Sequence, residues 1–368
     1  MTKLRDICRF QSGGTPSRGT PAYFNGNVPW ITTVALNGDV IDGNQAIEWI
    51  TGEAIAKSAA KIVPPHSVMV GTRVGIGKVA INSVPMSTSQ DIISLIGIDE
   101  NKWDKKFICH LITANKEHLT SQARGATIKG IKIEAIADLV LPEISLTEQA
   151  RISEVIGKVD ALMHMHQQMA MNLEQLIKSR FIELFGDIVL NPFGWEKDYL
   201  GVVCDVRDGT HDSPHYHSTG FPLVTSKNVT GGEIDLTDCS LISEADFNKI
   251  NERSKVNMGD IIMPMIGTVG KPVIVNVEPN FAIKNVSLIK FKDDSRVLNT
   301  FVRSLLQSDY FDDAVLSKVR GGTQKFISLG DIRKLAVIVP PMELQEQFAT
   351  FVKQTDKSKL CGKMEVAA

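Results

Sequence analysis

The chain has 368 residues, of which 43% are hydrophobic and 22% charged, and its net charge is −2. This composition is typical of a folded globular protein, and the length predicts two or three domains. The sequence excludes a disulfide framework or a zinc cage, because its five cysteines are scattered and form no Cys-x-x-Cys pair. A reducing, cytoplasmic compartment is therefore expected. Charged residues among the first ten, and the lack of any 18-residue apolar run, predict neither a signal peptide nor a membrane span.

The sequence repeats itself at a domain-sized interval. The matched segments are 28–32 with 221–225 and 94–96 with 287–289 at an offset of 193, 124–129 with 320–325 at 196, and 142–149 with 340–347 at 198. The increasing offset is what loop insertions produce. Solenoid repeats have units of roughly 20 to 50 residues, so these copies are too long to be solenoid units. The sequence predicts two similar domains.

Each copy opens with a loop rich in Gly, Pro and Thr, at 13–18 and at 208–214, and continues with short apolar runs. The predicted strands are 68–70, 78–81 and 92–96 in the first copy and 261–263, 273–275 and 286–289 in the second. Helices are predicted near 107–122 and 298–315. Each copy is therefore expected to be a mixed α+β globule.

A long helix is predicted from Leu146 to Phe185, with Ser145 or Thr147 as its cap and Glu148 in its first turn. It would be about 60 Å long at 1.5 Å per residue, too long to lie within a domain of this size. Apolar residues at three- and four-residue steps form one stripe along it. The stripe residues are Ile152, Val155, Ile156, Val159, Leu162, Met163, Leu173, Leu176 and Ile177.

The second copy ends in a shorter predicted helix that places Leu344, Phe348, Phe351 and Val352 on one face, and Gly362 is expected to break it. Two helices that each follow a similar domain are expected to pair as an antiparallel coiled coil, which would make the molecule pseudo-twofold symmetric. The predicted division is 1–143 for the first domain, 144–187 for the first helix, 188–341 for the second domain and 342–368 for the second helix.

Motifs for catalysis, nucleotides and metals are weak. The segment 71–78 resembles a phosphate-binding P-loop, but its glycine spacing is one residue too long and Val79 replaces the Mg²⁺-binding hydroxyl. Asn191-Pro192-Phe193 lacks the second proline of the amino-methyltransferase motif. The spacing of the three histidines at 211, 215 and 217 allows a metal site, but no matching cluster exists in the first copy. A recognition role without catalysis or metal is therefore favoured.

Local charge points to nucleic acid, although the net charge does not. An Arg-Gly-small-Thr-x-Lys pattern begins at Arg124 and recurs at Arg320, and Gly-Lys turns end at Lys78 and Lys271. Ordinary solvated loop charge is the alternative. The recurrence in both copies favours contacts with DNA phosphates.

Taken in order, these motifs resemble the specificity (S) subunits of type I restriction-modification systems. The resemblance is carried by 13–17, 23–26 and 28–31, by 208–211 with Pro214, by the closing 125–127 and 321–324, and by Pro142 or Pro340 leading into Leu-x-Glu-Gln. It covers essentially the whole chain. It implies two target-recognition domains, each reading one half of a split, asymmetric DNA sequence, with the paired helices as a spacer.

The resemblance also implies partners. Two modification subunits would bring S-adenosylmethionine, and restriction (motor-nuclease) subunits would use ATP and Mg²⁺, so no cofactor is expected in this chain. The expected DNA contacts are Thr15, Ser17, Arg18, Thr32, Thr33, Lys78, Arg124, Lys129, His211, His215, Thr225, Ser226, Lys227, Lys271, Arg320, Gln324 and Lys325.

Two other readings stay open at this point. One is a methyltransferase or nuclease that carries its own recognition domains, and the other is a coiled-coil scaffold that does not bind DNA. The second helix is also shorter than the resemblance implies. We therefore expect modification subunits or a second copy of the chain to cover the first helix around residues 163–177.

Overall fold

The computed structural model describes residues 1–368 except 39, 126–128, 231, 267–269, 319–325 and 368, and beyond Ser358 it describes the backbone alone. The chain forms two compact units, Met1–Leu162 and Met163–Ala368, and the division falls inside the long helix α5 (Leu146–Phe185). None of the described helices has the length and apolar character needed to cross a membrane.

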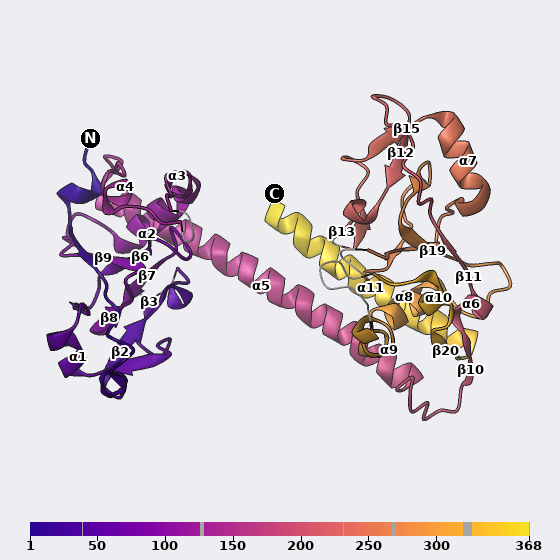
Figure 1. The fold of residues 1–368 in the computed structure, drawn as a ribbon, viewed down its shortest axis with the longest axis horizontal. Coiled ribbons are helices and arrows are strands. Elements are labelled where there is room, and N and C mark those ends of the chain that lie inside the picture. The colour runs from indigo at the N-terminus through magenta and orange to yellow at the C-terminus, as the bar shows by residue number, and fades with distance from the viewer. Residues whose placement is uncertain (39, 126–128, 231, 267–269, 319–325, 368) are drawn as a thin grey trace. The chain divides into compact units, whose positions relative to one another are not determined.

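The described residues of the first unit form two β-sheets and, before α5, four short α-helices; Figure 1 shows their arrangement. One sheet has the order β1 (Arg9–Ser12), β9 (Ile92–Ile96), β6 (Val68–Gly71), β7 (Val79–Asn82), β3 (Val40–Ile41). The other has the order β4 (Glu48–Ile50), β2 (Val28–Ile31), β8 (Met86–Thr88), β5 (Ile62–Val63). The helices are α1 (Gly52–Lys57), α2 (Lys105–Ala114), α3 (Lys116–Ser121) and α4 (Ile133–Ala137).

Side chains that point to opposite faces of the central strands pack into two separate cores in this unit. Val68 and Leu95 pack with residues of α2 on one face of the five-stranded sheet. Met69 and Ile92 point to the opposite face and pack with Ile31 of β2. Because side chains alternate between the faces of a strand, a strand apolar on both faces is buried between two layers. The five-stranded sheet therefore lies between the helices and the second sheet.

The second unit repeats this plan. Its larger sheet has the order β11 (Asp205–Asp208), β19 (Val286–Lys290), β16 (Ile261–Pro264), β17 (Val273–Ile274), and its smaller one β15 (Ser240–Ile242), β12 (Phe221–Val224), β18 (Ala282–Ile283). Two further pairs are β10 (Glu196–Tyr199) with β20 (Ala336–Val339) and β13 (Val229–Thr230) with β14 (Glu233–Ile234). The helices are α6 (Leu200–Val203), α7 (Glu244–Ser254), α8 (Asn299–Leu306), α9 (Asp309–Ala314), α10 (Leu329–Arg333) and α11 (Met342–Ala367).

The strand orders confirm the predicted duplication. β1-β9-β6-β7 corresponds to β11-β19-β16-β17, and β4-β2-β8 corresponds to β15-β12-β18. In both units the pair within the smaller sheet, β2 with β8 and β12 with β18, runs parallel. The prediction of two similar α+β domains with long helices is therefore correct.

One part of the sequence match is wrong by one residue. Val68 lies opposite Leu95 in the first unit, whereas Ile261 lies opposite Ile289 in the second. Leu95 and Ile289 both face the helix-covered core, so the true offset of this strand is 194 and not 193. A shift of one residue moves each side chain to the other face, and packing therefore overrides the local identity of the Ser-Leu-Ile letters.

The helix-start match at offset 198 is also wrong. The Gln149 side chain accepts from the Asp104 N–H (3.0 Å) and donates to the carbonyls of Lys102 and Ile144 (3.1 and 3.2 Å). Gln345 makes the same set, with the Leu298 N–H (2.8 Å) and the carbonyls of Arg296 and Pro340 (3.0 and 2.8 Å). The equivalent of Gln149 is therefore Gln345, at 196, and the exposed Gln347 is not.

Helix α5 has the bounds that were predicted. Ser145 is its cap, because the Ser145 hydroxyl accepts from the Glu148 N–H and the Glu148 carboxylate accepts from the Ser145 N–H, both at 3.2 Å. This is a capping box. In α11 the prediction that Gly362 breaks the helix is wrong, since the helix continues to Ala367. A glycine costs a helix only about 1 kcal/mol, which does not suffice to end it.

The two long helices contact each other through aromatic rings in the second unit. The ring of Phe348 lies 5.6 Å from Phe181 and 5.5 Å from Phe185, between centroids. One turn further along α11, Phe351 lies beside Arg180. Residue numbers that increase along α11 lie beside residue numbers that decrease along α5. The two helices therefore run antiparallel here, as predicted.

The pairing involves less of α5 than the apolar stripe predicted. Phe348 and Val352 are buried, and Ile177, Leu344 and Phe351 are half-buried. Ile156 and Leu173 are also half-buried, but the rest of the stripe is exposed: Ile152, Val155, Val159, Leu162, Met163 and Leu176. The sequence interpretation missed Phe181 and Phe185, which continue the four-residue step from Ile177 and end inside the domain core.

Candidate nucleic-acid interface

In the first unit the opening loop is fixed at its start by backbone contacts. The Gly13 N–H donates to the Ile92 carbonyl (3.0 Å) and the Gly14 N–H to the Thr88 carbonyl (2.9 Å). A Cβ on Gly13 would lie 2.1 Å from the Ser89 carbonyl oxygen, so only glycine allows this approach. The buried Trp30 indole donates to the Gly14 carbonyl (3.0 Å). The loop from Thr15 to Arg18 therefore leaves the sheet at a fixed point.

Arg18 is itself held in place. Its guanidinium donates to both carboxylate oxygens of Glu48, one at 2.8 Å, and lies 4.6 Å from the centre of the Phe24 ring. The bidentate pair and the ring orient the guanidinium more firmly than a single contact would. Arg18 was predicted to contact DNA. In the structure it also links the opening loop to β4, through Glu48.

The segment 88–92 joins this loop to the β6–β7 turn. Asp91 accepts from the Thr72 N–H through its carbonyl (2.8 Å) and from Arg73 through its carboxylate (3.4 Å). The Ile131 N–H donates to the Thr72 carbonyl (2.8 Å), which brings the predicted closing loop to the same turn. The segment 88–92, the β6–β7 turn and the closing loop are separate in the sequence. These bonds therefore bring them together at one edge of the unit.

Backbone hydrogen bonds join the two ends of the closing loop of the first unit. Arg124 and Gly130 exchange two backbone hydrogen bonds, of 2.9 and 3.0 Å. The side chains of Arg124 and Lys129 are exposed, and so is Lys78 at the end of the β6–β7 turn. This edge therefore presents cations from two neighbouring segments, a pattern suited to phosphates.

The second unit gathers the corresponding segments. The Gly209 N–H donates to the Val286 carbonyl and the Thr210 N–H to the Ile283 carbonyl, both at 3.0 Å. The Ile327 N–H donates to the Met265 carbonyl (2.9 Å), as Ile131 does to Thr72. The frames of the two edges are therefore alike.

The predicted contact residues fall into four groups: exposed, half-buried, buried and outside the described residues. Exposed in the loops are Ser17, Arg18, Lys78, Arg124, Lys129, His211, His215, Lys227 and Lys271. Thr15, Thr32, Thr225 and Ser226 are half-buried, and the Thr225 hydroxyl is bonded to Asn228 (3.0 Å). Thr33 is only 5% exposed, so its side chain is no longer expected to contact DNA. Arg320, Gln324 and Lys325 lie outside the described residues.

Some residues at these edges were not predicted. Arg73 lies in the β6–β7 turn beside Asp91, and Lys284 donates to the Ser213 hydroxyl in the opening loop of the second unit (2.6 Å). Arg253, at the end of α7, pairs with Asp208. The first copy has only the short α1 in place of α7, so comparison of the copies gave no signal for Arg253.

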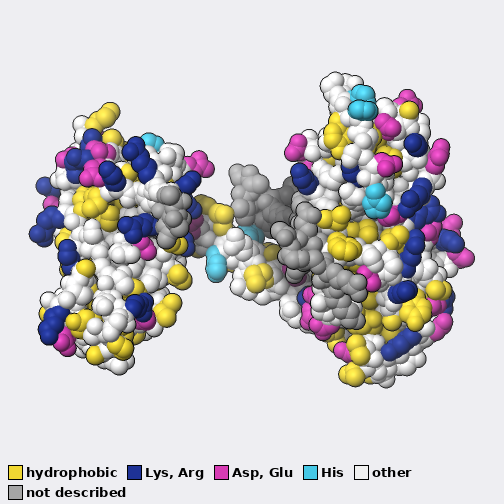
Figure 2. Space-filling view, viewed as in Figure 1, with side chains coloured by type: hydrophobic (Ala, Val, Ile, Leu, Met, Phe, Trp, Pro, Cys, Tyr) yellow, Lys and Arg dark blue, Asp and Glu magenta, His cyan; other side chains and the backbone are white. Residues whose placement is uncertain are grey.

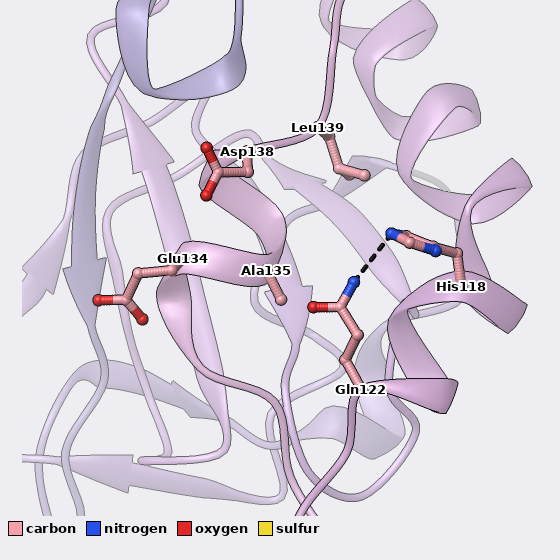
Figure 3. A pocket seen from close by; sticks show the side chains of 6 residues that line it. All are labelled: His118, Gln122, Glu134, Ala135, Asp138 and Leu139. Atoms are coloured by element: carbon pink, nitrogen blue, oxygen red, sulfur yellow. Dashed lines mark hydrogen bonds between the residues drawn. The ribbon is translucent and has the colours of Figure 1, made fainter.

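Two cavities of the described structure lie elsewhere. One of about 150 Å³ lies in the first unit and is lined by His118, Gln122, Glu134, Ala135, Asp138 and Leu139. Figure 3 shows the Gln122 amide paired with His118, at 2.8 Å. Asp138 is bound by Lys3 and Arg5, each at 2.7 Å, and these pairs hold its pKa below the usual range. The cavity is best explained as packing between α3 and α4.

A second hollow, of about 540 Å³, lies near the start of α11 and includes Trp195, Arg296 and Pro341. Arg296 is paired there with Glu196 (2.7 Å) and Asp198 (2.5 Å).

Among the described residues no three His, Cys, Asp or Glu side chains group as metal ligands.

Surface charge is mixed on both units. Figure 2 shows Lys and Arg interspersed with Asp and Glu on the visible faces, and the net charge of the chain is −2. The visible faces therefore carry no uniformly positive surface of the kind that favours nucleic acid.

Comparison with known families decides the identity. The model of the type I restriction modification DNA specificity domain matches residues 1–175 and again 192–362. The two matches correspond to the two units and together cover most of the chain. The chain belongs to this family.

The relatives that match this chain in sequence are specificity subunits. The MjaIX specificity subunit of Methanocaldococcus jannaschii is 25% identical over 96% of this chain and 85% of that protein. The EcoR124I/EcoR124II specificity subunit of Escherichia coli is 30% identical over 43% of this chain and 40% of that protein. The S subunit from M. genitalium has the same fold, with a TM-score of 0.60 at 15% identity over 100% of this chain and 91% of that one.

This specificity subunit is the non-catalytic, DNA-recognising component of a type I restriction-modification system. The two other readings of the sequence, a self-contained enzyme and a scaffold that does not bind DNA, are therefore not retained. The earlier resemblance named the correct family.

Proposed function

We propose that each unit reads one half of a split DNA sequence through the edge where its loops meet. The supporting observation is that two strand frames of the same order carry unlike loops. At the same position of the frame the first unit has Gly13 to Arg18 and the second has Gly209 to Pro214. A shared frame positions the readers, and different side chains read different bases, so the two half-sites should differ in sequence.

Two readers on one chain would multiply specificity. Each wrong base pair typically costs about 1 to 3 kcal/mol, and costs at separated positions roughly add. Helix α5, about 60 Å long at 1.5 Å per residue, would set the separation of the half-sites. Readers on one side of the duplex tend to lie about one helical turn apart.

The remaining chemistry would come from other subunits. We propose that two modification subunits dock on this chain and bring S-adenosylmethionine, and that restriction subunits bring ATP and Mg²⁺. The exposed apolar stripe of α5 is the candidate docking surface, and self-association through this helix stays a prediction. We also propose that the chain acts in the cytoplasm, as its scattered cysteines suggest.

Removing two cations from the closing loop should weaken DNA binding. In the double variant Arg124→Ala/Lys129→Ala, the assembled methyltransferase is expected to lose about 10- to 100-fold in affinity at moderate salt. The slope of log K against log salt should flatten by up to about 1.8, because each lost phosphate contact removes about 0.9.

The matched control is Lys102→Ala/Lys106→Ala, which removes the same charge from the exposed region around the start of α2. Affinity and salt slope should stay near those of the intact subunit. Equal losses in the two variants would mean that only net charge matters and would remove the closing loop from the interface.

A further inference from the structure

His211, in the opening loop of the second unit, is held by oxygen atoms at both ring nitrogens. Its Nε2 lies 2.9 Å from the Asp208 carboxylate and its Nδ1 lies 3.0 Å from the Asn285 side-chain oxygen. A neutral imidazole has one N–H donor, whereas the protonated ring has two. Only the imidazolium donates to both partners at once.

The two hydrogen-bond acceptors, Asn285 and Asp208, favour the protonated ring. Asp208 is 8% exposed, ends β11, and also accepts from Arg253 of α7. The hydrogen bond to Asn285 and the one to Asp208 raise the pKa of His211, and the nearby positive charge of Arg253 opposes them. Lys284 is engaged by the Ser213 hydroxyl (2.6 Å), and Asp212 follows His211 directly in the loop.

The His211 contacts join the two strands between which the loop begins. Asp208 belongs to β11, and Asn285 directly precedes β19 with a left-handed backbone (φ +55°). The Asn285 N–H donates to the Thr210 carbonyl (3.2 Å), so the ring closes a small loop of contacts around Gly209 and Thr210. Loss of one of its two hydrogen bonds would free the side of the loop that carries the predicted contacts.

The first unit fixes its opening loop with a group that does not titrate near neutral pH. Ser12 and Thr15 stand at the positions of Asp208 and His211, 196 residues earlier, and the loop is tied instead by Arg18 to Glu48. A guanidinium keeps its charge at every pH at which the protein is folded. The two readers therefore differ in how pH acts on them.

We propose that His211 is a positioning residue whose protonation orders the opening loop of the second unit, so that reading of the second half-site, and not of the first, weakens as pH rises. The proposal rests on the assignment of these loops as DNA readers. A histidine whose pKa is raised on folding stabilises the ordered loop fully below its unfolded pKa, near 6.5. That stabilisation is lost as pH rises through the folded value.

The test uses the assembled methyltransferase and its own target, identified by methylome sequencing. Affinity is measured from about pH 6 to about pH 8.5 for DNA with the intact target and for DNA with a base change in either half-site. The expected result is that discrimination against changes in one half-site falls about tenfold as pH rises, as loss of a charged hydrogen bond implies, while the other half-site is unaffected.

Variants separate charge from shape. His211→Arg, permanently charged, should keep discrimination at the highest pH, whereas His211→Gln should show the weakened value at every pH. His217→Gln, an exposed histidine in the same segment, should behave as the intact chain does. A pH profile that His211→Gln leaves unchanged, or equal pH effects on both half-sites, would overturn the proposal.

A direct measurement distinguishes this proposal from the proposed function. The imidazole of His211 is titrated by NMR in the free subunit, together with the backbone signals of residues 209–214. Titration above pH 6.5, with the loop signals following it, supports the positioning role even if DNA binding were absent. A pKa at or below 6.5 would refute it even if DNA binding is as proposed.

Discussion

Phe185→Ala is expected to lower the free energy of unfolding of the second unit by about 3 to 5 kcal/mol, the usual cost of removing a buried phenyl ring. Phe185 is 0% exposed, and its ring lies 5.0 Å from Phe181, 4.9 Å from Phe301 and 5.5 Å from Phe348, between centroids. The cavity would open between α5, α8 and α11, so α11 should lose its hold on α5. Hydrogen exchange of peptides from residues 342–358 measures this loss directly.

The control is Ile182→Ala on the same helix, three residues away and 60% exposed. It should change stability by less than about 0.5 kcal/mol and leave exchange in α11 as it was. If Phe185→Ala left α11 protected, the aromatic cluster would not be what joins the two helices.

Gln345→Ala is expected to cost about 3 kcal/mol although it removes no charge and little apolar area. Its side chain is 0% exposed and satisfies the Leu298 N–H and the carbonyls of Arg296 and Pro340. A buried polar group left without a partner costs about 1 to 3 kcal/mol. Because Leu298 caps α8, the substitution should also release the N-terminus of that helix.

The neighbouring Gln347→Ala is the control that distinguishes two alignments of the repeat. Gln347 is exposed, and a change there should stay within about 0.5 kcal/mol. Gln149→Ala in the first unit should resemble Gln345→Ala, since it makes the equivalent bonds to Asp104, Lys102 and Ile144. Denaturant unfolding of the full chain checks all three. A larger effect at Gln347 than at Gln345 would contradict the equivalence.

The sequence predicted those features of the fold that local patterns determine. Apolar periodicity, with Ser145 or Thr147 as cap, predicted the bounds of α5, and the repeat predicted two domains of one design. The sequence did not predict registers correctly. Ser94 to Ile96 and Ser287 to Ile289 share letters, but their registers against β6 and β16 differ by one residue, because burial on a particular face depends on neighbours distant in the chain.

The same limit applies to the long helices. The stripe on α5 looked continuous from Ile152 to Ile177, yet most of it is exposed, and the contact with α11 lies at Phe181 and Phe185. Spacing identifies which residues share a face of a helix. It does not identify what covers that face.

At the candidate interface the structure brings the predicted loops together, but it gives some of their side chains partners that the sequence did not reveal. The opening and closing segments meet the β6–β7 turn as one edge in the first unit, held by backbone bonds such as Ile131 to Thr72. Arg18 and His211 were predicted as contacts, but both are tied to acidic residues within their own unit, Glu48 and Asp208. The partners come from other strands, so only the folded chain reveals them.

Methylome sequencing of cells that contain the assembled methyltransferase tests most directly whether each unit reads its own half-site. The measurement compares the intact subunit with Gly13→Ala and with Gly209→Ala. An added Cβ would lie 2.1 Å from the Ser89 carbonyl oxygen in the first case and 2.4 Å from that of Ile283 in the second, so each change displaces one opening loop.

The intact chain is expected to give a methylated motif split into two unlike halves. Gly13→Ala should relax or abolish the sequence requirement in one half and Gly209→Ala in the other. A continuous motif, or two variants that alter the same half, would contradict the assignment of one reader to each unit.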